Sequence, residues 1–153
     1  DDLIVFGGGK GQPQSNDELN VLCQDVINTA KEYSAKFIYT LGGFHTNRIF
    51  GKEPKTYITT TSRELTKQME GLDVETTPQK SVITGFNGLI LGFAKRNGIH
   101  GIGMYAELNV PEIPQYRSAI SIIKTIERLT YRNLGDTSHL ETMAQEIERK
   151  FKN

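Results

Sequence analysis

Three polar side chains near the ends of predicted strands have the chemistry of an acid–base or anion-binding site. His45 and Arg48 follow an apolar run that ends at Leu41, and Glu107 lies at the end of the last predicted strand. Histidine exchanges protons near neutral pH, and arginine holds anions through its planar guanidinium. Glu107 is the carboxylate expected to lie near His45 and Arg48. The sequence shows no nearby carboxylate pair and no H-x-x-x-H ligand set beside these two residues. A solvated loop or a subunit contact is favoured over catalysis, so we assign no catalytic residue and no metal ligand.

A glycine-rich loop over residues 7–11 suggests phosphate binding, but its spacing is wrong for the known motifs. A P-loop requires Gly-Lys followed by Ser or Thr, whereas Lys10 is followed by Gly11. The dinucleotide-binding spacing G-x-G-x-x-G also fails, because Gln14 stands where the third glycine is needed. A flexible turn is the favoured interpretation, and Lys10 is kept as a candidate ligand-binding residue.

Two apolar runs that end in threonine and glycine provide the other candidate ligand-binding positions. Thr40 and Gly42 end one predicted strand, and Thr84 begins a turn that contains Gly85 and Gly88. Ligands of open α/β sheets bind at the carboxyl ends of strands, and free N–H groups at a helix start favour an anion. The spacing of these glycines serves close helix packing equally well, and packing is favoured over binding.

The composition excludes several classes of partner. The chain has 153 residues and a formal net charge of zero, with 18 Lys and Arg against 18 Asp and Glu. A nucleic-acid-binding protein normally carries a basic excess, so we expect no nucleic-acid partner. No apolar run approaches the roughly 20 residues that span a bilayer, and no signal peptide is visible, so we expect a cytoplasmic protein without a membrane partner. The single cysteine, Cys23, falls within a helical pattern as an expected buried thiol, and nothing in the sequence implies a cofactor.

Hydrophobic periodicity predicts strands and helices that alternate along most of the chain. The predicted strands cover residues 3–6, 36–41, 56–60, 81–84 and 102–108. Capping boxes of the form Ser/Thr-x-x-Glu predict helix starts at Ser15, Thr61 and Ser138. Two further helices are predicted over residues 86–96 and 119–129.

This order predicts an α/β fold with a largely parallel sheet, as a single domain over residues 1–153, closed by a C-terminal helical hairpin. The last helix carries an apolar stripe from Leu140 to Phe151, and covering the sheet is favoured over partner contact as its role. The chain begins at Asp1 without a methionine and enters a predicted strand almost at once, so we expect upstream sequence to be missing.

Two segments carry a resemblance to a known family. The strand Ile-Tyr-Thr-Leu-Gly-Gly-Phe at residues 38–44 and the turn and helix Ile-Thr-Gly-Phe-Asn-Gly-Leu-Ile-Leu-Gly at residues 83–92, followed by the closing helical pair, resemble the proteasome assembly chaperone family. The match is to its archaeal branch, which is related to the second subunit of the eukaryotic chaperone heterodimer and has also been labelled ATP-grasp-like. It covers nearly the whole chain.

The resemblance implies a three-layer α/β/α sandwich similar to purine nucleoside phosphorylases and a binding protein rather than an enzyme. Members self-associate or pair with a paralogue and bind proteasome subunits, so a homo-oligomer with proteasome partners is implied here. The family also has an N-terminal part that this chain lacks. Some archaeal members dock through a C-terminal hydrophobic-Tyr-any tripeptide, whereas this chain has Lys152 at the Tyr position, so that docking mode is not expected if Asn153 is the terminus.

Two functions remain in competition at this point. The leading hypothesis is a proteasome-assembly-chaperone-like protein that acts through oligomeric surfaces. The alternative is a small-molecule enzyme or sensor of phosphorylase-like fold that binds a nucleotide or an anion at the strand ends. The alternative requires Lys10, His45, Arg48 and Glu107 to gather around one cleft.

Overall fold

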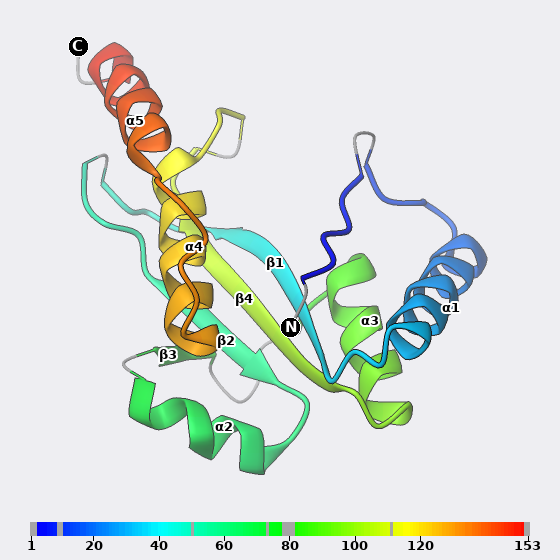
Figure 1. Ribbon diagram of the computed structural model, residues 1–153. Coiled ribbons are helices and arrows are strands. Elements are labelled where there is room, and N and C mark those ends of the chain that lie inside the picture. Colours follow the sequence, from blue (N-terminus) through cyan, green and yellow to red (C-terminus); the bar gives the residue numbers. More distant parts are fainter. Residues whose placement is uncertain are drawn as a thin grey trace.

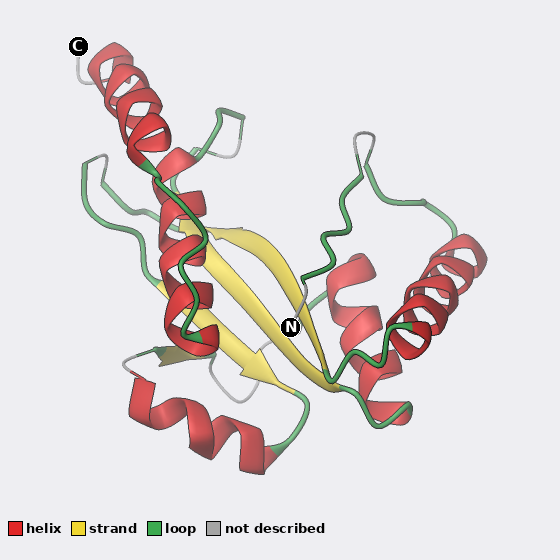
Figure 2. Cartoon of the chain, in the orientation of Figure 1, coloured by secondary structure: helices red, strands yellow, loops and turns green. Residues whose placement is uncertain are grey.

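The computed structural model describes residues 3–8, 11–49, 51–72, 74–77, 82–110 and 112–151. The elements are α1 (Asn16–Glu32), β1 (Phe37–His45), β2 (Thr56–Thr60), α2 (Arg63–Met69), the 3₁₀ helix η1 (Glu70–Leu72), β3 (Glu75–Thr76), α3 (Gly85–Arg96), β4 (His100–Leu108), α4 (Tyr116–Thr130) and α5 (Ser138–Phe151). Figures 1 and 2 show a twisted sheet with helices on either side of it. The α/β class expected from the sequence is confirmed.

The sheet has four described strands in the order β1-β4-β2-β3. β1 and β4 are parallel over their full length, from Phe37 opposite His100 to His45 opposite Leu108. β2 runs antiparallel to β4, and the short β3 runs parallel to β2. The described sheet is therefore mixed, with two parallel pairings, as the predicted largely parallel sheet requires, and one antiparallel pairing. No crossover helix is described between β1 and β2, and β2 enters the sheet from the end that β1 leaves.

The alternation of side chains along the strands supplies two hydrophobic clusters, one on each face of the sheet. Ile38 of β1 packs into the cluster of α1 and α3, whereas its neighbour Tyr39 packs into the cluster that involves α2 and α4. The first cluster contains the buried residues Cys23, Ile27, Ala30, Ile90, Ala94 and Ile99. The second contains Ile58, Leu65, Met69, Ile102 and Met104. Cys23 is fully buried as expected, and burial raises the pKa of its thiol.

One predicted helix cap is confirmed and two are wrong. The Ser15 hydroxyl caps α1 as expected by accepting a hydrogen bond from the Glu18 N–H (3.2 Å), and it donates to the Glu18 carboxylate (3.0 Å). The cap of α2 is Ser62, whose hydroxyl accepts from the Leu65 N–H, whereas the neighbouring Thr61 accepts from the Gly101 N–H. At α5, Ser138 does not cap with its own side chain.

The start of α5 depends on an aspartate instead. The Asp136 carboxylate accepts hydrogen bonds from the N–H (2.9 Å) and the hydroxyl (2.5 Å) of Ser138. These bonds, the hydroxyl first, lower the pKa of Asp136. A carboxylate near a helix N-terminus satisfies donors that the helix leaves open.

Two predicted strands are absent from the part of the chain that the structure describes. Leu3, Ile4, Val5 and Phe6 are irregular, with side chains 52–83% exposed. Residues 82–84 are also irregular, while Ser81 lies outside the described residues. Both segments have the apolar composition of a strand, but a strand also requires a neighbour for its backbone hydrogen bonds, and neither segment pairs with the sheet.

The last two helices sit against each other at the carboxyl end of β4. α5 packs on α4, and Figure 1 shows it extending past the sheet rather than across it. Only Ala144 of α5 is fully buried, and Leu140, Met143 and Ile147 are half-buried. The interpretation that this stripe covers the sheet is therefore wrong. Among the described residues, no helix has the length and apolar character needed to cross a membrane.

Candidate functional site

The candidate residues from the sequence fall into two separate groups in the structure. Thr40 and Gly42 of β1 lie beside Tyr105 of β4, on the face of the sheet that α3 covers. The Thr40 hydroxyl is 3.4 Å from the Tyr105 hydroxyl, and a Cβ at Gly42 would lie 3.0 Å from the Tyr105 ring. Burial raises the pKa of Tyr105, and the contact with Thr40 partly offsets this. The aromatic ring thus fills the space beside these two candidates.

The start of α3 is held by a residue that sequence reasoning missed. Thr84 occupies the cap position, but its side chain makes no capping hydrogen bond. Instead, the Gln12 side-chain oxygen accepts from the Phe86 N–H at 2.8 Å. Gly85 has a φ of +70°, and a Cβ there would lie 2.6 Å from the Gln12 amide nitrogen. One of the N–H groups predicted to bind an anion is therefore already bonded to Gln12, and Lys10 lies outside the described residues.

The second group gathers where β1 and β4 end. His45 donates from Nε2 to the Asn109 carbonyl oxygen at 3.0 Å. Glu107 accepts from the Lys55 N–H at 2.9 Å, and Arg48 donates from Nη1 to the Lys52 carbonyl. In the described part of the chain, no hydrogen bond joins His45, Arg48 and Glu107 to one another. The structure brings the three to one end of the sheet, as the sequence suggested, but each is bonded to backbone.

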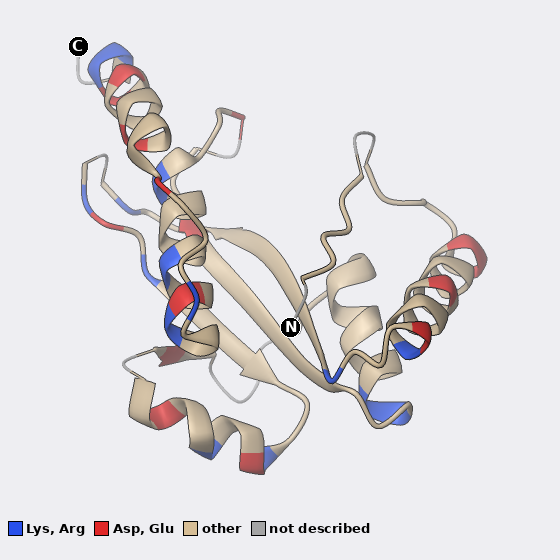
Figure 3. Cartoon of the chain, viewed as in Figure 1, with Lys and Arg blue, Asp and Glu red and all other residues tan. Residues whose placement is uncertain are grey.

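The electrostatic centre of this region is an arginine on α4 that the sequence did not single out. Arg117 is bonded through Nε and Nη2 to the two carboxylate oxygens of Glu148, and through Nη1 to Glu141 at 3.1 Å. Glu53 lies 3.5 Å from the same Nη1. The hydrogen bond to Glu148 is the main cause that raises the pKa of Arg117. Burial lowers the pKa of Arg48, and the nearby carboxylates of Glu107 and Glu148 partly offset this effect. Figure 3 shows charged residues gathered on the helices and loops around the sheet.

The sequence contains one weak indication of this Arg117 cluster, namely the spacing of two of its glutamates. Glu141 and Glu148 are seven residues apart, so they share a face of a helix. The arginine that they bind is on a different helix, and periodicity gives no means of pairing the two.

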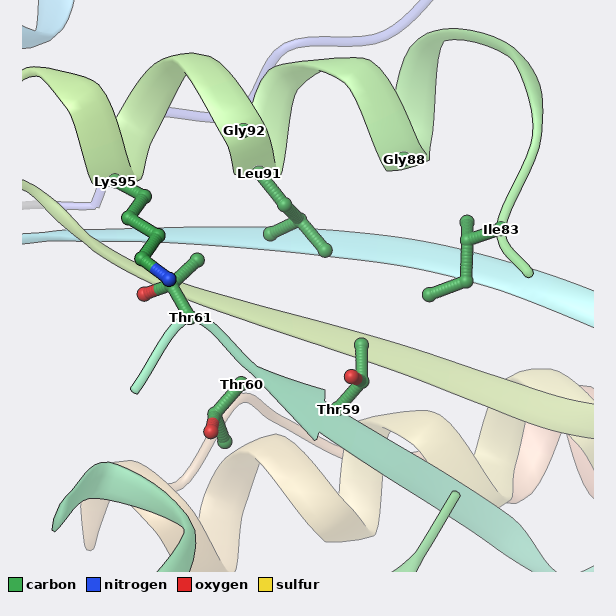
Figure 4. A pocket seen from close by; sticks show the side chains of 8 residues that line it. All are labelled: Thr59, Thr60, Thr61, Ile83, Gly88, Leu91, Gly92 and Lys95. Atoms are coloured by element: carbon green, nitrogen blue, oxygen red, sulfur yellow. The ribbon is translucent and has the colours of Figure 1, made fainter. Parts of the chain in front are cut away.

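A groove lies between α3 and β2 and has a volume of about 330 Å³. Figure 4 shows Lys95 reaching from α3 toward Thr61, with Leu91 and Ile83 along the same side. The groove is lined by Thr59, Thr60, Thr61, Ile83, Gly88, Leu91, Gly92 and Lys95. Of the candidate residues that the structure describes, only Gly88 belongs to it. His45, Arg48 and Glu107 do not line it, so the cleft required by the small-molecule alternative is not formed by that set.

No three His, Cys, Asp or Glu side chains among the described residues form a group that could hold a metal ion. The arrangement thus offers an ion-paired helix junction and an open groove.

Comparison with known proteins identifies a family and a related sequence. The model of the PAC2 family matches residues 1–153. An uncharacterized protein of Methanocaldococcus jannaschii, MJ1210, is 40% identical over 86 residues, which are 56% of this chain and 33% of that protein.

Two solved structures share the fold. Pyrococcus furiosus PbaA, described as an archaeal homolog of proteasome-assembly chaperone, superposes with a TM-score of 0.80 at 21% identity, over 93% of this chain and 58% of that chain. Pyrococcus furiosus PbaB, described as an archaeal proteasome activator, also gives 0.80 at 22% identity, over 92% of this chain and 59% of that one. The part of each relative that this chain matches is thus less than two thirds of that relative's length.

Proposed function

This chain belongs to the PAC2 family, and we propose that it acts by binding proteasome subunits in the manner of an assembly chaperone. The observation that carries the proposal is the family match over all 153 residues. The fold shared with PbaA and PbaB is consistent with it, since those proteins are described as a chaperone homolog and an activator of proteasomes. A function of this kind needs a surface that recognises a partner, and it needs no reaction centre.

The surface we propose for the partner is the apolar side of α5. Leu140, Met143 and Ile147 lie on one face of the helix, and packing against α4 leaves all three half-exposed. Apolar side chains that stay accessible on one face of a helix are typical of helix-in-groove recognition. The Arg117 ion pairs fix the direction of α5, so this face is presented in a defined orientation.

The test is co-purification with α-type proteasome subunits at micromolar concentrations, using two charge variants of the same helix. Met143→Glu places a carboxylate on the apolar face, and Gln145→Glu places the same group on the exposed face. We expect the unmodified protein and Gln145→Glu to retain the subunits and Met143→Glu to lose them. Equal retention by both variants would contradict the proposed surface, and no retention by the unmodified protein would contradict the function.

The remaining details of the proposal follow from the family rather than from any one contact. We propose a homo-oligomer that works in the cytoplasm, with the helices on both faces of the sheet forming the three-layer α/β/α arrangement of phosphorylase-like proteins. Light scattering after size-exclusion chromatography checks the first point, because a monomer mass near the 17.1 kDa of the chain contradicts self-association.

A second candidate function, binding of a nucleotide or small anion, is supported by the groove between α3 and β2. Its volume of about 330 Å³ is at the lower end of the roughly 300–1,000 Å³ of ligand sites. Lys95 supplies a positive charge at one end (Figure 4). A thermal-shift screen of nucleotides and phosphates tests this function. A ligand that stabilises the unmodified protein but not Lys95→Met would support it, with Arg96→Met, the adjacent exposed residue, as the control.

A further inference from the structure

Two residues that line the same small cavity each carry a buried hydrogen-bond donor with no acceptor among the described residues. The donors are Nε of Arg48, in the loop after β1, and Nδ2 of Asn109, at the end of β4. The cavity is also lined by the loop before α4 and by residues of α4 and α5, including Arg117 and Glu148. Leaving a buried polar group unpaired costs about 1–3 kcal/mol, so a native protein normally provides each such group with an acceptor.

The orientations of both donors are fixed by their other bonds. The Asn109 side-chain oxygen accepts from the Val110 N–H at 3.0 Å, which assigns the amide and leaves Nδ2 as its buried donor. Arg48 is anchored by the bond from its Nη1 to the Lys52 carbonyl. Because guanidinium Nε and amide Nδ2 can only donate, whatever occupies the cavity must accept from both.

The size of the cavity restricts the occupant to a single small species. Its volume is about 20 Å³. A cavity holds a water molecule once this volume exceeds roughly 10–15 Å³, so there is room for one water and not for a phosphate or an organic acid. A halide ion is the one other common acceptor of that size.

The surrounding charges favour water over a halide. Arg48 and Arg117 contribute two positive charges, whereas four carboxylates lie around them, namely Glu53, Glu107, Glu141 and Glu148. An added anion would meet this negative excess at short range. Water accepts two hydrogen bonds and retains two protons to donate, and the Glu148 carboxylate on the cavity wall is an acceptor for one of them.

We propose that this cavity is a hydration site, in which one ordered water accepts from Arg48 Nε and Asn109 Nδ2 and donates to Glu148. The water connects the loop after β1, the end of β4 and helix α5, three segments that are far apart in the sequence. The site is independent of the proposed proteasome binding, since it concerns only groups within this chain.

Nuclear magnetic resonance of the unmodified protein in water tests the proposal directly. We expect cross-relaxation peaks between the water signal and both the Arg48 Hε and the Asn109 Hδ2 protons. The sign of these peaks should be that of a long-lived bound water and not that of mobile surface water. Absence of these peaks on both donors contradicts the proposal. A saturable shift of the Arg48 Nε signal on titration with bromide at constant ionic strength contradicts it in favour of a halide.

A matched pair of variants adds a second readout. Asn109→Leu keeps the side-chain size and removes one donor, whereas Asn47→Leu makes the same change at an exposed position of the loop after β1. We expect Asn109→Leu to abolish the water peak at Arg48 Hε and to speed exchange of that proton at least several-fold, and Asn47→Leu to change neither. Unchanged exchange in a folded Asn109→Leu protein would overturn the two-donor site. If that variant does not fold, the measurement on the unmodified protein still decides.

Discussion

Arg117 on α4 and Glu148 on α5 face each other with their charged groups aligned side by side. Nη2 of Arg117 donates to Oε2 of Glu148 at 3.1 Å, and Nε donates to the other carboxylate oxygen. The two side chains are only 16% and 13% exposed, so solvent screens this pair little. Because α5 packs on α4 with one fully buried residue, the ion pair is a main determinant of how α5 is held.

The first prediction concerns this pair. Arg117→Met should lower the free energy of unfolding by about 2–4 kcal/mol, because it removes two charge-assisted hydrogen bonds from the mostly buried Glu148 carboxylate. Urea denaturation followed by circular dichroism measures the change. The control is Lys55→Met, which removes an ion pair whose partners are both more than half exposed and should leave the midpoint unchanged. Equal changes in the free energy of unfolding for the two variants would show that the Arg117 ion pair does not stabilise the packing of α5.

The second prediction compares two glycines of α3. A Cβ at Gly88 would lie 2.2 Å from the Ile83 carbonyl oxygen, whereas a Cβ at Gly92 would meet no atom within 4 Å. Gly88→Ala should destabilise the protein by about 1–3 kcal/mol through overpacking. Gly92→Ala should stabilise it by about 0.5–1 kcal/mol, because alanine is the better helix former. Thermal unfolding of both variants is sufficient, and shifts in the same direction would contradict the geometry at the start of α3.

The third prediction concerns the long-range cap of α3. Gln12→Ala should cost about 0.5–2 kcal/mol, as expected for the loss of a side-chain oxygen that accepts from a helix N-terminus. Amide hydrogen exchange at Phe86 should accelerate in the same variant. Gln24→Ala removes only a surface bond to Asn28 on α1 and should change neither quantity. Unchanged exchange at Phe86 in the Gln12 variant would rule out this cap.

The fourth prediction is a pH dependence at the start of α5. The hydrogen bonds from Ser138 lower the pKa of Asp136, so the stabilisation is present above the ordinary aspartate pKa of about 3.9 and is lost as pH falls through the lower native value. Ser138→Ala removes the hydroxyl bond, which is the largest cause, and should raise the pKa of Asp136 toward the ordinary value. A carboxyl-detected titration of both proteins measures this. The same pKa in the two proteins would contradict the assigned cause.

The parts of this fold that local sequence determines were predictable. The helix cap at Ser15 joins residues three positions apart, and the helix expected over residues 86–96 begins at Gly85. The sequence-based predictions are wrong where two neighbouring residues could both cap a helix, or where a residue distant in the sequence determines the contact. Thr61 and Ser62 both carry a hydroxyl, and only the position of Gly101 shows which of them caps α2.

The residues of the candidate site were harder to predict, because their contacts join segments that are far apart in the sequence. Gln12 and Phe86 are 74 residues apart, and Arg117 and Glu148 are 31 residues apart, so no local pattern connects them. The direction of β2 and the irregular state of residues 3–6 were also inaccessible, because alternation predicts an extended segment without identifying its neighbour. The position of His45, Arg48 and Glu107 at one end of the sheet was foreseeable, since parallel strands end together.

The proposed binding of proteasome subunits by this PAC2 family chain is tested most directly by native mass spectrometry of the mixed proteins. The purified chain would be mixed at micromolar concentrations with archaeal α-type subunits and, separately, with β-type subunits. We expect a peak whose mass is the sum of this chain and α-type subunits, weakened by Met143→Glu and retained by Gln145→Glu. Spectra that contain only the separate components, with both kinds of subunit, would contradict it.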